Sequence, residues 1–133
     1  MKKTFLIIIL SFLVGILLPP ETKNLTAAPS LNYTQLGKAS WYSRKSSGIN
    51  RHTANNEIFN DQDMTCAMWG VSFNRLVRVT NLTNGKSIVV RVNDRGPHRR
   101  FLKKGRVIDL TLEAFSRLED HKNGLIDVEI ELL

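Results

Sequence analysis

The sequence predicts a mainly β domain, a small barrel of five or six short strands with one short helix. The clearest observation is the alternation of apolar and acidic residues over 124–133, which is typical of a strand with one buried face. A second is the pair Asn84-Gly85 between two alternating apolar runs, which predicts a β-hairpin. Segments rich in Ser, Asn and Gly separate the other apolar runs, so we expect short strands.

The first expected strand covers residues 37–42 and ends in two neighbouring aromatic residues, Trp41 and Tyr42. Side chains alternate along a strand, so one ring should face the core and the other a groove. An aromatic ring facing a groove could stack on a pyranose. The sequence leaves open which ring does so, and Trp69, just before a glycine, is expected to be more exposed than either.

A polar, irregular loop is predicted over residues 43–63. Within it, Asn55-Asn56 indicates a tight turn, because Asn tolerates left-handed backbone better than most residues. This turn would present Glu57. The short apolar segment 65–68 then predicts a small strand.

The expected hairpin joins a strand over 76–81 to a second strand that runs into the segment 86–97. This segment begins with branched apolar residues, which favour a strand, and ends in Asp-Arg-Gly-Pro, where a strand cannot continue. It therefore delivers Asp94 and Arg95 to the rim of the sheet. A carboxylate held there is well placed for acid/base chemistry; the alternative is a pair that only stabilises the turn.

After the hairpin, residues 99–104 form a basic run that we expect to be a solvated loop able to meet anionic groups. Residues 106–110 predict a further strand. Thr111 is suited to cap a short helix over about 112–119, and the alternating segment already described completes the chain.

The N-terminus predicts an export signal over residues 1–27. Two lysines precede an apolar run over 5–18, which is too short for a comfortable membrane span of about twenty residues. Ala27 offers a small residue for cleavage. We therefore expect a lead-in over 28–35, a single domain over 36–133 and, after cleavage, no membrane anchor.

The formal net charge of +7 favours polyanionic partners. Nucleic acid is a poor candidate outside the cytoplasm, so a wall polymer with carboxylates or phosphates is the better one. Cys66 is the only cysteine, which excludes an internal disulfide, and its distance from the cleavage region argues against a lipoprotein. The three histidines have no metal-ligand spacing, so we expect no metal and no cofactor.

Several of these segments together resemble one family. The matching residues are Gly37-Lys-Ala-Ser-Trp-Tyr42, Thr53-Ala54 with Glu57 and Phe59, Val77-Arg-Val-Thr-Asn81, Asn84-Gly85, Val89-Val-Arg-Val-Asn-Asp-Arg-Gly-Pro97 and Ile108-Asp-Leu110. In this order they resemble the rare lipoprotein A family, peptidoglycan-acting proteins related to expansins. The resemblance implies a six-stranded double-psi β-barrel with one short helix.

The same resemblance implies an exported endolytic lytic transglycosylase in the periplasm or cell envelope, acting on peptidoglycan glycan strands as a monomer. An acid protonates the glycosidic oxygen between N-acetylmuramic acid and N-acetylglucosamine. The substrate's own C6 hydroxyl then attacks the anomeric carbon and gives a 1,6-anhydro product. One carboxyl group can therefore serve first as acid and then as base.

Carried over residue by residue, the resemblance implies Asp94 as this acid and Glu57 as a second acid that polarises the sugar or assists proton transfer. Because a cation beside Asp94 would lower its pKa, we expect the Arg95 side chain to point away from it. The residues that we expect to bind substrate are Trp41, Tyr42, Thr53, Asn93 and Arg95.

The chain departs from the family pattern after Thr65-x-Ala67, where His and Arg are usual and Met68 and Trp69 stand here. Methionine neither donates a hydrogen bond nor titrates, so this exchange predicts the loss of a polarising partner, and Met68→His should raise activity. The departure keeps open an alternative class, a non-catalytic peptidoglycan-binding or wall-loosening module with the same barrel. A scaffold for division-site partners is a third, weaker option.

Overall fold

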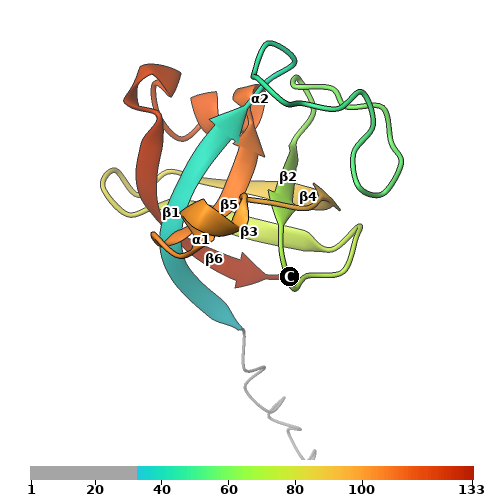
Figure 1. Cartoon of the computed structure of the whole chain (residues 1–133). Coiled ribbons are helices and arrows are strands. Elements are labelled where there is room, and N and C mark those ends of the chain that lie inside the picture. The colour runs from blue at the N-terminus through green and yellow to red at the C-terminus, as the bar shows by residue number, and fades with distance from the viewer. Residues whose placement is uncertain (1–32) are drawn as a thin grey trace, which may run out of the picture. The chain divides into compact units, whose positions relative to one another are not determined.

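The computed structural model describes residues 33–133, in which six strands close into a barrel (Figure 1). The order of neighbouring strands is β1-β5-β2-β4-β3-β6, with β6 returning to β1. The pairs β1·β5 and β2·β4 are parallel and the others antiparallel. The strands are β1 (Thr34–Tyr42), β2 (Thr65–Met68), β3 (Leu76–Asn81), β4 (Ser87–Asp94), β5 (Arg106–Thr111) and β6 (Leu125–Leu132). The six-stranded, mainly β barrel predicted from the sequence is confirmed.

The helices differ from the prediction in number and length. The expected helix after Thr111 is present as α2 (Leu112–Ser116), and the Thr111 hydroxyl accepts a hydrogen bond from the Ala114 N–H. A second helix, α1 (Arg99–Leu102), occupies the run that we expected to be a loop, with the imidazole of His98 accepting from the Arg100 N–H. A short 3-10 helix, η1 (His121–Asn123), precedes β6.

The strand ends explain how the barrel closes. β1 begins at Thr34, before the expected domain start at residue 36, because Thr34 pairs with Glu131 of β6. The β3·β4 hairpin forms as predicted, and of its two turn residues only Gly85 takes a positive φ, of 74°. The Asn84 side chain instead accepts a hydrogen bond from the Lys86 N–H.

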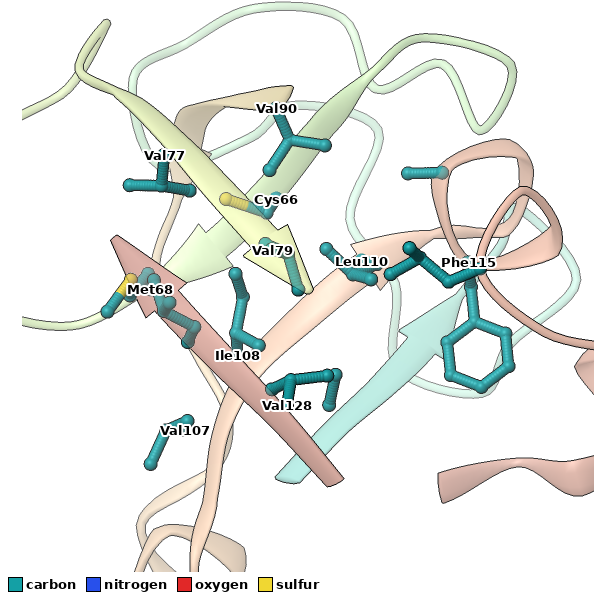
Figure 2. Close-up of a cluster of buried hydrophobic side chains, with 14 of the residues drawn as sticks. Cys66, Met68, Val77, Val79, Val90, Val107, Ile108, Leu110, Phe115 and Val128 are labelled. Carbon is teal, nitrogen blue, oxygen red and sulfur yellow. The ribbon is translucent and has the colours of Figure 1, made fainter. Parts of the chain in front are cut away.

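The core lies inside the barrel and follows from strand alternation. In β6, Val128 and Ile130 are fully buried, while Asp127 and Glu129 between them are exposed. Figure 2 shows Val77, Val79, Val90, Leu110 and Val128 converging on this interior. Cys66 lies among them, and burial raises the pKa of its thiol, which fits a small apolar filler rather than a nucleophile.

The predicted export signal over residues 1–27 and most of the predicted lead-in lie outside the described residues. Within 33–133, no helix is long and apolar enough to cross a membrane.

Replacing Val128 by Asp should lower the free energy of unfolding by about 3–5 kcal/mol, because it places an unpaired carboxyl in the apolar core. Urea unfolding followed by fluorescence would measure the loss. Leu125→Asp is the matched control, since Leu125 begins the same strand and is 48% exposed. Equal losses in the two variants would contradict the placement of Val128 in the core.

Candidate functional site

A cleft of about 720 Å³ opens where the ends of several strands meet two irregular segments. Most residues of the β1–β2 connection between Ser46 and Ala54 line it. A second lining segment contains part of α1 and consists of Gly96, Pro97, His98, Arg100 and Phe101. The connection between β1 and β2 extends beyond the strands in Figure 1. The volume lies in the range of small-molecule sites.

Asp94, the last residue of β4, projects its carboxyl group into this cleft. Its Oδ1 accepts two backbone hydrogen bonds, from Ala54 N at 2.9 Å and from Arg95 N at 2.8 Å. No hydrogen bond or ion pair joins Oδ2 to any described residue. One oxygen is therefore held by the backbone while the other is available to a molecule in the cleft.

The Arg95 side chain points away from the Asp94 carboxylate, as predicted. Its guanidinium donates to the Met68 carbonyl at 3.0 Å and lies 3.8 Å from the centre of the Phe73 ring. The guanidinium also donates to the backbone carbonyl of Asp94 at 3.4 Å, and it forms no ion pair with the carboxylate. Arg95 lines the cleft, but these contacts occupy its charged end.

Glu57 does not share the cleft with Asp94. Its carboxylate accepts hydrogen bonds from two guanidinium nitrogens of Arg91, at 2.6 and 2.9 Å. It also accepts from the side-chain amides of Asn93 at 3.0 Å and Asn55 at 2.8 Å. These donors hold the pKa of Glu57 at about 2, with the Arg91 bond the largest cause. Arg91 and Asn93 alternate with Asp94 along β4, so they face the other side of the strand. Glu57 is thus ionised and turned away from the cleft.

The aromatic residues divide differently from the expectation, because both Trp41 and Tyr42 line the cleft. Tyr42 is buried and stacks on Phe59 with ring centroids 4.7 Å apart. Its hydroxyl has no hydrogen-bond partner within residues 33–133, and burial raises its pKa. Trp41 donates through its indole N–H to the His121 carbonyl at 2.8 Å. Trp69 is 43% exposed, and its indole N–H donates to a backbone carbonyl beside the cleft.

The two remaining expected substrate residues are largely engaged within the protein. The buried Thr53 lines the cleft, but its hydroxyl donates to the Asn55 side chain at 2.6 Å. Asn93 is buried and donates to Glu57, while its side-chain oxygen has no partner in the part of the chain that the structure describes. These contacts are typical of residues that support the loop beside the cleft.

The sequence reasoning missed Asp109, a second carboxyl group in the cleft. It lies in β5, is 9% exposed and bonds Arg106 at 2.6 Å. Burial raises its pKa, Arg106 opposes that shift, and the nearby Asp94 charge adds to it. A Cβ on Gly96 would lie 3.4 Å from the Asp109 carboxylate, so the glycine lets the turn pass close to it. The sequence feature that could have identified Asp109 is its position as the one acidic residue among the apolar residues of β5.

Met68, where the resemblance implies a His, has its side chain in the core rather than in the cleft. It is 2% exposed and is surrounded by the apolar residues of the barrel interior (Figure 2). In β2 it follows Ala67, which does line the cleft, so alternation turns Met68 inward. Met68 therefore presents no group to the cleft, and the effect of this exchange on activity stays a prediction.

A family model described as lytic transglycolase matches residues 34–130, which is nearly the whole barrel. The chain belongs to this family. It is 44% identical over 106 residues to a probable endolytic peptidoglycan transglycosylase RlpA of Nostoc, covering 80% of this chain and 28% of the relative. It is 43% identical over 101 residues to the endolytic peptidoglycan transglycosylase RlpA of Vibrio cholerae, covering 76% and 36%. The predicted resemblance to rare lipoprotein A is confirmed.

Solved structures support the barrel of this lytic transglycolase domain. A Streptomyces papain inhibitor matches with a TM-score of 0.59 at 20% identity, covering 76% of this chain and 94% of its own. An expansin of Clavibacter michiganensis matches with a TM-score of 0.56 at 21% identity, covering 76% and 50%. The expansin-like double-psi fold is confirmed. The chain spans about a third of the length of the curated relatives it matches.

The lowered pKa of Glu57 predicts a pH-dependent contribution to stability. The contribution is complete above the ordinary value of 4.5 and disappears as the pH falls towards about 2. Glu57→Gln should therefore unfold more easily than the parent at pH 7, by about 1 kcal/mol or less because the side chain is 37% exposed. The difference in the free energy of unfolding between the parent and Glu57→Gln should therefore shrink as the pH falls from 4.5 towards about 2.

Urea unfolding at stepped pH values would measure this difference. Glu129→Gln serves as the control, because Glu129 is an exposed carboxylate of β6. A difference between Glu57→Gln and the parent that stays constant from pH 7 to pH 2 would contradict the ion pair as its cause.

Met68→His should destabilise the domain by about 2–3 kcal/mol without raising activity, because it buries an imidazole among apolar side chains. The control Met68→Leu conserves volume and should change stability by less than about 1.5 kcal/mol. Unfolding curves and glycan-digestion rates of the three proteins give the test. A stable Met68→His protein with increased activity would show that this side chain reaches the cleft.

Proposed function

We propose that this chain is an endolytic peptidoglycan lytic transglycosylase that cleaves the bond between N-acetylmuramic acid and N-acetylglucosamine and leaves a 1,6-anhydromuramyl end. The observation that carries the proposal is the Asp94 carboxyl group, anchored through Oδ1 and open through Oδ2 in a cleft. Family membership and the names of the similar proteins agree with this activity. Trp41, which is less buried than Tyr42, supplies flat apolar area for a sugar ring.

In the proposed reaction, protonated Asp94 gives its proton to the glycosidic oxygen through Oδ2. The bond between this oxygen and the anomeric carbon breaks, and the substrate's C6 hydroxyl oxygen bonds to the same carbon. The Asp94 carboxylate then accepts the C6 hydroxyl proton. Protons balance, because the enzyme returns to its starting form and no water is consumed.

The two other acids take different roles in this proposal. Asp109 lies in the same cleft with a raised pKa, so it is a second group able to hold a proton beside the reacting sugar. Glu57 is a positioning residue: its ion pair with Arg91 and its bond with Asn93 fix the segment of β4 that leads to Asp94. This role replaces the sugar-polarising role implied by the resemblance.

The proposal includes the setting in which the protein acts. Cleavage of peptidoglycan requires a location in the cell envelope, and an export signal over residues 1–27, removed on export, would supply it. The expected substrate is a glycan strand, and the proposed catalyst is a monomer that needs no cofactor, because the substrate provides its own nucleophile.

Asp94→Asn should abolish anhydromuramyl ends while leaving binding to sacculi intact, because the amide keeps the shape but cannot deliver and recover a proton. Mass spectrometry of sacculus digests and sedimentation of bound protein would measure the two effects. Asp127→Asn is the matched control, because the Asp127 side chain is 61% exposed and lies outside the cleft.

The parent and the control should both produce anhydromuramyl ends. If the parent binds sacculi but produces none, the chain is a peptidoglycan-binding module and the enzymatic proposal fails. If Asp94→Asn retains the parent rate, another residue is the acid.

A further inference from the structure

A basic segment over residues 98–104 borders the cleft. Of its basic residues, His98 and Arg100 line the cleft, and Arg99, Lys103 and Lys104 lie beside them in the chain. All five are exposed, and among the described residues none of their side chains forms an ion pair. The lining residues of the β1–β2 connection carry no Lys, Arg, Asp or Glu side chain. The cations beside the cleft are thus gathered on and around α1.

Three arginines line the cleft, and their partners distinguish them. Arg95 is held by the Met68 carbonyl and the Phe73 ring, and Arg106 is paired with Asp109 at 2.6 Å. Arg100 has no carboxylate partner in the described part of the chain. Of the three arginines that line the cleft, Arg100 is therefore the one whose charge is available to a bound ligand.

Phe101 positions this free charge. The Arg100 guanidinium carbon lies 4.6 Å from the centre of the Phe101 ring, and that of Arg106 lies 4.8 Å from the same centre. Contact with an aromatic face restrains a long side chain and leaves the nitrogen donors of the guanidinium available. A guanidinium held in this way suits a carboxylate, which it can bind through two parallel hydrogen bonds.

We infer that Arg100, with the neighbouring cations Arg99 and Lys103, forms a subsite for a carboxylate carried by the glycan. The inference rests on the proposed function, in which a peptidoglycan strand occupies the cleft. In such a strand a carboxylate comes from the lactyl group of a muramic acid without a peptide, or from the peptide attached to that group. The strand therefore lies with its muramyl substituents towards α1, and a neutral glycan lacks this contact.

The test measures binding separately from turnover, in full-length protein carrying Asp94→Asn. Three soluble glycans are compared: one bearing peptides, one stripped of peptides so that the lactyl carboxylates are free, and one with every carboxylate methyl-esterified. In this background, Arg100→Gln should weaken binding to carboxylate-bearing glycan about three- to fivefold. Arg99→Gln/Arg100→Gln/Lys103→Gln should weaken it about tenfold. Arg100→Lys should restore part of the loss, since the charge returns without the planar fork.

The controls are Arg75→Gln and Arg75→Gln/Lys86→Gln/Lys122→Gln, which remove the same numbers of exposed cations outside the cleft. They should bind as the parent does. On esterified glycan the Arg100 variants and the parent should bind alike. A loss confined to peptide-bearing glycan assigns the carboxylate to the peptide, and a loss confined to stripped glycan assigns it to the lactyl group.

Two results would overturn the subsite: parental affinity of the triple Arg99/Arg100/Lys103 variant for both carboxylate-bearing glycans, or a loss that persists on esterified glycan. Absence of anhydromuramyl ends from the parent would instead remove the enzymatic proposal and leave the binding comparison intact. Failure of the Asp94→Asn protein to bind any of the three glycans would overturn both.

Discussion

The attachment of the β1–β2 connection to the end of β4 is the constraint on which the cleft depends. The connection is long and polar, so it cannot be held by apolar burial over most of its length. Polar contacts with consecutive parts of β4 hold it instead. They include Ala54 to the Asp94 carboxylate, Asn55 N to the Asn93 carbonyl at 3.2 Å, and Glu57 to Arg91. The same carboxylate that is open to the cleft thus also fixes one of its walls.

This arrangement gives Glu57 and Asp94 different roles, which the sequence alone does not distinguish. Glu57 and Asp94 are both acids beside the same strand, yet their environments differ. Glu57 is surrounded by donors and stays ionised, which makes it a structural anchor. Asp94 receives donors on one oxygen alone. The number and placement of hydrogen-bond donors therefore distinguish the fully bonded carboxylate of Glu57 from that of Asp94, which keeps one oxygen open to the cleft.

Much of the fold could be predicted from the sequence because the relevant information is local. The alternation in β6 and the turn at Gly85 depend on neighbouring residues, and both appear where expected. The positions that were missed depend on long-range packing. Asp109 faces the cleft only because β5 lies between β1 and β2, and Met68 faces the core because of its place in β2. Helix α1 was missed because it is only four residues long and the basic run over 99–104 has no apolar periodicity that would predict a helix.

The strand order has a consequence for when the domain can form. In the barrel, β1 lies between β5 and β6, which are the last two strands in the sequence. The first strand therefore has no partner until the C-terminal residues are available, and the many contacts between distant residues make folding slow compared with a helical domain of this size. The barrel therefore closes only after the C-terminal strands have been made, and the N-terminal strand is the one that waits longest for its partners.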